Sequence, residues 1–302
     1  MNNAYFTLLS SDNYLEGFFF FNEFFQRSNP QYPLNVMITD NCSQKTFFKL
    51  EQYCKGYKNI IIRKIRAVNF KHADVKRWVT TLNKFQILNY KEYDKVAFVD
   101  IDILFFKNMD FVFNKCDKIW CWVEEDIPRG LTTDGKWCSQ FDMVDNPERK
   151  AELKKYYSWY GEFRYNFWGG LFVMNTKQYN FEDIVKQYRE YSFSADEFVL
   201  NDIIIKDKPL YEKLFNISKE EALIKDISQE DETGNAVYFI HFKIWFFPFN
   251  TPLMHGTNWN GKDFNFLNTT EKRKDFVNNM LTNTNFRREI LDILQNYYCL
   301  LI

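Results

Sequence analysis

Two aspartates separated by one residue, Asp100 and Asp102, are the part of this sequence whose type and spacing most clearly suggest chemistry. They stand between two apolar runs, 96–99 and 103–106, and the first run is typical of a buried strand that ends at a sheet edge. Because unpaired charges are costly in an apolar core, the carboxylates need a partner. A divalent cation is the simplest one, since Mg²⁺ and Mn²⁺ take oxygen ligands and bridge to substrate phosphates. The alternative is a strand end that points both carboxylates at water; the position between two strands favours the metal.

The elements that must position these carboxylates follow an α/β pattern. Strand-like runs and helical segments alternate from the first residues onward, which predicts a parallel sheet. A helix is predicted to begin near Tyr14, where Ser10, Ser11 or Asp12 could cap it, and its apolar continuation over 18–25 is typical of a buried helix. The strands are predicted at 4–9, 34–39, 59–63, 96–99, 103–106, 117–123 and 236–242, and further helices at 73–90 and 271–300.

The composition excludes several classes of protein. The 302 residues carry a formal net charge of −1, so no global field recruits nucleic acid or an anionic membrane. No apolar run reaches the roughly 18 residues of a membrane span, and no signal peptide precedes the first predicted strand. The six cysteines show neither a C-x-x-C pair nor the spacing of zinc ligands. We therefore expect a cytoplasmic protein with free thiols.

The segment 81–113 resembles the family 8 glycosyltransferases, the group of glycogenin and galactinol synthase. In that family a lysine-bearing helix is followed by Y-x-K, a strand, D-x-D, a second strand and N-x-D-x-(L/V)-F. The corresponding residues here are Lys84, Tyr93, Lys95, Asp100, Asp102, Asn108, Asp110 and Phe113. The resemblance implies a GT-A-type fold and the transfer of a sugar from a UDP-sugar to an acceptor hydroxyl.

The first strand and the turn after it resemble the part of the family that holds the uridine. The family pattern T-L-x-(T/S)-x-D-x-Y-x-x-G is met by Thr7, Leu8, Ser10, Asp12, Tyr14 and Gly17. The resemblance implies that the tyrosine ring lies against the base, whereas the alternative for Tyr14 is packing on the sheet. Arg77 is offset by about two residues from the family arginine. The implied donor-binding residues are Leu8, Ser10, Ser11, Tyr14, Arg77, Asp100, Ile101 and Gly170.

Residues 195–201, ADEFVLN, match the family pattern D-Q-x-x-(L/F)-N, with Glu197 in place of the glutamine. The resemblance implies that Asp196 lies beside the anomeric carbon of the donor, where a carboxylate stabilises positive charge developing on the sugar ring. A lysine at the place of Lys84 is implied to reach the same donor. The candidate catalytic residues are therefore Asp196, Glu197 and Lys84. The alternative for the aspartate is an acid at a helix N-terminus without substrate contact.

The segment HFKIWFFPF, 241–249, resembles the family pattern H-(F/Y)-x-G-x-x-K-P-W. The resemblance implies that His241 completes a metal site with Asp100 and Asp102, and a neutral imidazole with two carboxylates suits Mn²⁺, or Mg²⁺ in its place. The alternative for a lone histidine on an apolar strand is a core position. Phe247 stands where the family lysine neutralises the leaving diphosphate, and Lys243 is one candidate replacement.

The expected organisation is a single GT-A-type α/β domain over 1–250, with a mixed, mostly parallel sheet flanked by helices. An insertion at about 124–165, rich in aromatic residues, is expected on the acceptor side. A C-terminal loop and helical extension, 251–302, is expected to pack on the domain or on a second subunit of a homodimer. The sequence does not identify the acceptor, and the resemblance is compatible with a glycan, a polyol or a protein.

Three functions compete at this point. The first is a retaining, Mn²⁺-dependent hexosyltransferase with a glucose-, galactose- or GlcNAc-type UDP donor. The second is a UDP-sugar- or glycan-binding protein that has lost turnover. Three departures from the family patterns favour it: Trp168 replaces the asparagine of F-N-(S/A)-G-x-x-(V/L), Glu197 replaces a glutamine and Phe247 replaces a lysine. The third is a nucleotidyltransferase, which normally has a Gly-rich, basic phosphate loop after the first strand. The segment 9–14 contains neither glycine nor lysine, which argues against the third function.

Overall fold

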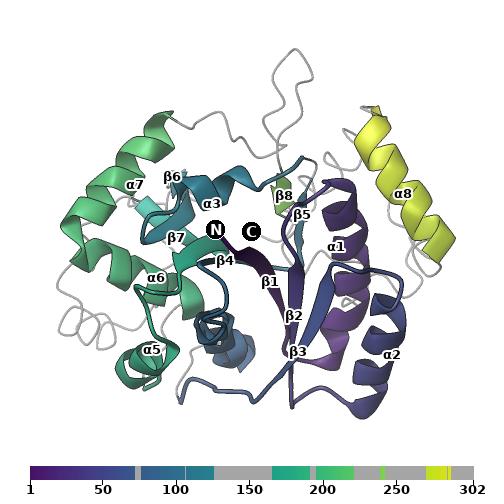
Figure 1. The fold of residues 1–302 in the computed structure, drawn as a ribbon, viewed down its shortest axis with the longest axis horizontal. Helices are drawn as coiled ribbons and strands as arrows, with labels where there is room; N and C mark the ends of the chain where they lie inside the picture. Colours follow the sequence, from purple (N-terminus) through teal and green to yellow (C-terminus); the bar gives the residue numbers. More distant parts are fainter. Residues whose placement is uncertain are drawn as a thin grey trace, which may run out of the picture. The chain divides into compact units, whose positions relative to one another are not determined.

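The computed structural model describes residues 1–71, 76–105, 107–125, 165–190, 195–220, 239–241, 270–283 and 285–286 (Figure 1). Six strands form one sheet in the order β3-β2-β1-β4-β7-β6, and β5 pairs with β8 in a separate two-stranded sheet. The large sheet consists of β1 Asn3–Leu9, β2 Leu34–Thr39, β3 Ile60–Ile65, β4 Lys95–Val99, β6 Ile119–Glu125 and β7 Tyr165–Asn175. The small sheet consists of β5 Ile103–Phe105 and β8 Phe239–His241.

The helices follow the alternation that the sequence predicts. The 3-10 helices are η1 Asp12–Tyr14 and η2 Lys76–Asn89, and the α-helices are α1 Leu15–Arg27, α2 Gln44–Cys54, α3 Phe111–Lys115, α5 Phe181–Tyr188, α6 Ala195–Lys206, α7 Lys208–Glu220 and α8 Thr270–Thr282. The helix predicted at 73–90 is thus a 3-10 helix that is described from Lys76 onward. Most of the insertion at 124–165 and most of the segment 251–302 lie outside the described residues.

The sheet is mixed, which confirms the predicted fold class. β1 runs parallel to β4, with Asn3 opposite Lys95. β7 runs antiparallel to β4, and β6 antiparallel to β7. β4 is buried from Val96 to Val99, as expected for a strand with neighbours on both sides.

The chain divides into two compact units. Unit 1 contains Met1–Leu8, Arg63–Val99 and Val112–Ala222, and unit 2 contains Leu9–Ile62, Asp100–Phe111 and Leu223–Ile302. In unit 1, α6 packs on β7 and on η2, and α7 packs on β6. Phe172 of β7 lies against Phe85 and Phe98, with ring centroids 5.5 and 5.4 Å away.

In unit 2, α1 is buried on almost all sides, as its run of phenylalanines predicts. Phe21 and Phe25 contact Phe105 of β5, with centroids 6.4 and 6.1 Å away. Phe20 contacts Phe276 of α8 at 5.5 Å, so the described part of the C-terminal segment packs on α1.

The predicted capping of the first helix is wrong in its details. Ser11 occupies the N-cap position of η1 without a side-chain hydrogen bond to that helix, and the same holds for Tyr14 before α1. The Asp12 carboxylate instead accepts a hydrogen bond of 2.7 Å from the backbone N–H of Ser43, the N-cap residue of α2. This bond lowers the pKa of Asp12. Asp12 therefore links two helix starts instead of capping its own helix.

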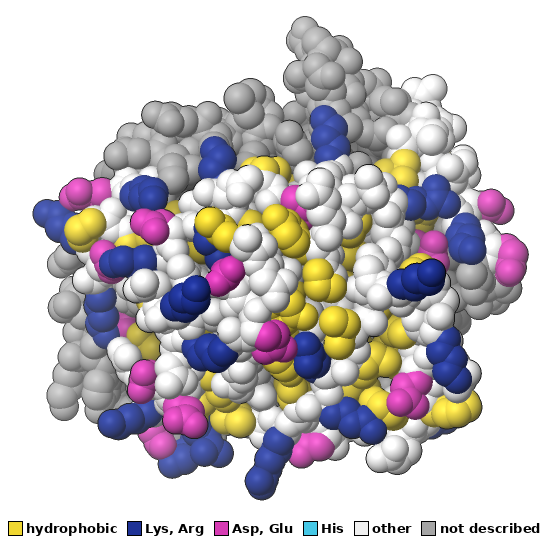
Figure 2. Space-filling model, in the orientation of Figure 1, with side chains coloured by type: hydrophobic (Ala, Val, Ile, Leu, Met, Phe, Trp, Pro, Cys, Tyr) yellow, Lys and Arg dark blue, Asp and Glu magenta, His cyan; other side chains and the backbone are white. Residues whose placement is uncertain are grey.

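On the face shown in Figure 2, Lys and Arg side chains are interspersed with Asp and Glu. Within the described part of the chain, no helix combines the length and the apolar character needed to span a membrane.

Candidate functional site

The two aspartates after β4 lie in a tight turn of unit 2. The N–H of Ile103 donates to the carbonyl of Asp100 at 3.1 Å, which closes a β-turn over the D-x-D triplet. Asp102 is 8% exposed, whereas Asp100 is partly exposed. Ile101 is buried against α1, where a Cβ added to Gly17 would lie 3.2 Å from its Cδ1. The turn is therefore packed on the first helical residues after η1.

The strand that carries His241 pairs with the strand that follows this turn. In the antiparallel pair of β5 and β8, Ile103 is opposite His241, so the backbone of His241 lies beside the residue that follows Asp102. The side chain of His241 lies outside the described part of the chain. Among the side chains that are described, no group of three or more His, Cys, Asp or Glu is arranged to hold a metal. Two carboxylates and an imidazole fit Mn²⁺ by their donor chemistry, and the metal site stays a prediction.

The predicted nucleotide-binding residues after β1 lie where the ends of two strands meet in unit 2. The hydroxyl of Thr39, at the end of β2, donates to the carbonyl of Ser10 at 3.3 Å. The Cys42 thiol contacts the carbonyl of Leu9 at 3.4 Å. Ser10 is 8% exposed, and Tyr14 is partly exposed.

The remaining donor-binding candidates are distributed over both units. Ser11, Asp100 and Ile101 belong to unit 2 together with Ser10 and Tyr14, whereas Leu8, Arg77 and Gly170 belong to unit 1. Leu8 is partly exposed and Gly170 is buried in β7. The side chain of Arg77 lies outside the described part of the chain.

In unit 1, two of the three candidate catalytic residues form a buried ion pair. The Nζ of Lys84 lies 2.7 Å from Oδ2 of Asp196, and it also donates to the carbonyl of Gly169 at 3.2 Å. The two side chains are only 10% and 7% exposed. The same ammonium lies 5.1 Å from the ring centroid of Phe98, a favourable cation–π distance. The pair holds the carboxylate at one place, at the first turn of α6.

Gly169 makes this arrangement sterically possible. A Cβ at this residue would overlap Oδ2 of Asp196, lie 3.0 Å from its Cγ and lie 3.2 Å from Cγ of Glu197. Glycine within a strand marks a close approach to the backbone, and here the approaching group is the carboxylate. The sequence analysis named Gly170 as a donor-binding candidate, whereas the structure adds Gly169 as the position of close approach. The paired glycines in a strand were the signal for it.

Asn201 attaches α6 to β7 through its side-chain amide. Its Nδ2 donates to the carbonyl of Phe167 at 3.0 Å, and its Oδ1 accepts from the N–H of Phe167 at 3.1 Å. Nδ2 also donates to the carbonyl of Glu197 at 2.7 Å. The amide thus bonds to both backbone groups of Phe167 and links α6, which carries Asp196, to β7. Glu197 is partly exposed.

The chain is distantly similar to several known proteins. No family model matches it. Uncharacterized protein R707 of Acanthamoeba polyphaga mimivirus is 22% identical over 271 residues, which cover 80% of this chain and 92% of that protein.

Among solved structures, the chain is similar to the bifunctional glycosyltransferase WbbM, with 18% identity and a TM-score of 0.46 over 66% of this chain and 36% of that one. It is also similar to the galactosyltransferase LgtC in complex with donor and acceptor sugar analogues, with 16% identity and a TM-score of 0.43 over 66% and 70% of the two chains. Mouse xyloside xylosyltransferase 1 shows 8% identity and a TM-score of 0.39 over 68% and 83%. The chain thus spans 36% of the length of WbbM, and these likenesses do not assign it to a family.

Proposed function

We propose that the protein is a glycosyltransferase that moves a sugar from a UDP-sugar to an acceptor hydroxyl, with retention of the anomeric configuration. The observation that carries the proposal is the buried ion pair of Lys84 and Asp196 against Gly169. Removing two charges from water costs desolvation free energy that their attraction does not always recover. A buried pair beside a strand glycine is therefore better explained by a role in function than by a role in stability. The motif resemblance implies the same position at the transferred sugar for these two residues and supports the proposal.

Asp100, Asp102 and His241 are proposed to hold the metal on the donor diphosphate. The buried Asp102 and the turn closed by Ile103 present carboxylate oxygens from a rigid backbone, which suits a hard cation. When bound, Mn²⁺ supplies positive charge for the phosphate oxygens of the leaving UDP. Ser10, Ser11 and Tyr14 are proposed to hold the nucleoside, because they follow β1 at the junction of two strand ends.

Asp196 is proposed to stabilise the sugar as the bond between its anomeric carbon and the UDP oxygen breaks. In a retaining transfer on one face, the acceptor hydroxyl forms the new bond to that carbon and its proton passes to the leaving phosphate oxygen. The anomeric carbon is positively charged after its bond to the UDP oxygen breaks and before its bond to the acceptor oxygen forms. A fixed carboxylate stabilises that charge. Lys84 acts on the carboxylate as a positioning residue, since its ammonium lies 2.7 Å from Oδ2 of Asp196 and holds that oxygen at the first turn of α6.

The test is a panel of UDP- and GDP-sugars incubated with the protein, with and without Mn²⁺, while nucleotide release and intact protein mass are recorded. We expect metal-dependent UDP release from one donor, and loss of that release in Asp102→Asn and Asp196→Asn. A mass increase by whole hexose units would identify the protein itself as acceptor. UDP binding without release from any donor would contradict the transferase and favour the sugar-nucleotide-binding protein.

A further inference from the structure

Asn108 and Asp110, which follow β5 in unit 2, form a hydrogen-bonded clamp that the proposed chemistry does not use. The N–H of Asp110 donates to Oδ1 of Asn108 at 2.7 Å, and Nδ2 of Asn108 donates to Oδ2 of Asp110 at 3.0 Å. Both side chains are partly buried. The reciprocal bonds fix the two side chains relative to each other.

The clamp holds the chain where it leaves α1. Nδ2 of Asn108 also donates to the carbonyl of Asn29 at 2.7 Å, and Oδ2 of Asp110 accepts from the N–H of Gln31 at 2.9 Å. Asn29 has φ 54°, and no other described non-glycine residue has a positive φ. Asparagine tolerates this left-handed conformation better than most residues, but the conformation still needs support from its surroundings. The two hydrogen bonds provide that support at the carbonyl of Asn29 and the N–H of Gln31, on either side of Pro30.

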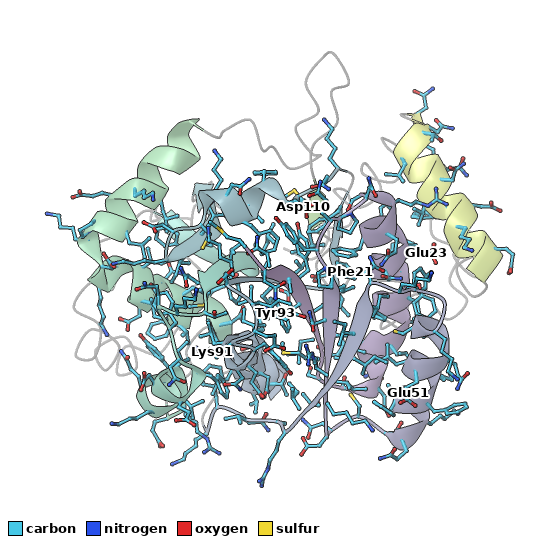
Figure 3. All side chains as sticks on the ribbon, in the orientation of Figure 1. Phe21, Glu23, Glu51, Lys91, Tyr93 and Asp110 are labelled. Carbon is cyan, nitrogen blue, oxygen red and sulfur yellow. The ribbon has the colours of Figure 1, made fainter. Side chains whose placement is uncertain are left out.

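The same helix contacts the metal-binding segment at two further places. Near the start of α1, Gly17 lies against Ile101 of the D-x-D turn. In its middle, Phe21 and Phe25 contact Phe105 of β5. Figure 3 shows the labelled Phe21 and Asp110 on these neighbouring parts of unit 2. Among the described residues, the segment 100–110 is therefore attached to α1 and to the turn after it at three places, and at the clamp the attachment consists of directional hydrogen bonds.

We propose that Asn108 and Asp110 are positioning residues for the metal-binding turn. Apolar contacts alone allow a strand to slide along a helix, because they have little directional preference. The hydrogen bonds from the clamp to Asn29 and Gln31 prevent this sliding. They fix the position of the turn that carries Asp100 and Asp102 along the axis of α1. This inference rests on the proposed function, since it concerns the turn that is to hold the metal.

The first measurement is Mn²⁺ binding in the presence of UDP, followed by the loss of the EPR signal of the free ion. The second is the Mn²⁺ concentration that gives half-maximal UDP release. Asn108→Asp keeps the size of the side chain but removes the Nδ2 donor, and Asp110→Ala removes the shared acceptor. We expect both variants to bind Mn²⁺ about ten-fold more weakly, with turnover at saturating Mn²⁺ within about two-fold of wild type. Asp110→Asn keeps an oxygen acceptor at the same place and is expected to restore binding to within about three-fold.

Asn114→Asp is the matched control, because it makes the same chemical change at an exposed residue of α3 and should leave Mn²⁺ binding unchanged. If Asn108→Asp does not fold, the comparison of Asp110→Ala with Asp110→Asn is sufficient to test the positioning role, since neither variant buries a new charge. Wild-type Mn²⁺ affinity in Asp110→Ala, together with lost affinity in Asp102→Asn, would overturn the positioning role and leave the transferase intact. Failure of the wild-type protein to bind Mn²⁺ would instead overturn the metal site itself.

Discussion

At the scale of single residues, the site in unit 1 depends on the absence of a side chain. The carboxylate of Asp196 occupies space that a Cβ at residue 169 would need, and its partner Lys84 also bonds to the carbonyl of Gly169. Glycine here has a steric role, since its φ is not in the left-handed region. Even the smallest addition must therefore move the carboxylate.

Gly169→Ala is expected to lower the turnover number about 100-fold, because a displacement of about 1 Å at a reacting centre has that effect. The measurement is UDP release at saturating donor and Mn²⁺. Gly56→Ala is the control, since a Cβ there would meet only the carbonyl of Tyr53 at an ordinary 3.6 Å. Equal turnover in the two variants would show that the carboxylate has no part in the reaction.

Lys84→Met is expected to cost about 3–5 kcal/mol of the free energy of unfolding, because it leaves the buried Asp196 carboxylate uncompensated. Urea unfolding monitored by circular dichroism measures this cost. Lys177→Met breaks the pair with Asp94, whose side chains are 72% and 35% exposed, and should leave the free energy of unfolding close to that of wild type, because water screens an exposed pair. The double variant Lys84→Met/Asp196→Leu should recover much of the loss; a double variant as unstable as the single one would show that packing, not charge, is responsible.

At the scale of elements, side chains of or beside the helices form hydrogen bonds with the backbone of another element and so fix where the helices lie. Asn201 attaches α6 to β7, Asp12 joins the start of η1 to that of α2, and Asn108 with Asp110 holds the end of α1. Side chain–backbone bonds of this kind make the placement of a helix specific, whereas its burial supplies most of the stability.

Phe276→Ala on α8 is expected to cost about 3 kcal/mol, because the side chain is 6% exposed and packs on Phe20 of α1. Thermal unfolding at matched protein concentration provides the comparison. Phe48→Ala makes the same change on α2, where the side chain is 59% exposed, and should stay within about 0.5 kcal/mol of wild type. Similar losses in both variants would contradict the packing of α8 on α1.

Asp12 gives unit 2 a pH-dependent contact. Its folded pKa lies below the ordinary value of 3.8 because of the hydrogen bond from the Ser43 N–H. The stabilisation is therefore present above the unfolded pKa and is lost as pH falls through the lowered folded pKa. Asp12→Asn should be less stable than wild type by up to about 1 kcal/mol near neutral pH, and the difference should vanish below the folded pKa. A difference that persists unchanged in acid would show that the charge is not its source.

At the scale of the whole molecule, the strands of the large sheet differ in burial according to whether they have one neighbouring strand or two. β1 and β4 each have a strand on both sides, and β4 is buried from Val96 to Val99. β3 lies at one edge, and none of its residues is fully buried.

Hydrogen exchange measured by mass spectrometry should therefore show the amides of β1 and β4 exchanging at least about 100-fold more slowly than those of β3, since interior strands open only with the whole core. Peptides confined to β7, which also has two neighbours, serve as the internal reference. Equal protection in β3 and β4 would contradict the edge position of β3.

The sequence by itself determined several of the elements and the segments that carry chemistry, whereas β7 and α7 were not among the predicted elements. Apolar runs predicted β2 at its observed bounds and placed D-x-D at the end of β4, because local hydrophobic patterning decides which segments are buried strands. The all-round apolar run at 18–25 likewise predicted the buried α1. Only the tertiary structure decided which side chains meet: Lys84 and Asp196 are 112 residues apart in sequence, and Asn108 and Asn29 are 79 apart. Such contacts depend on how whole elements pack and on the backbone space that glycine leaves, and neither is encoded in local spacing.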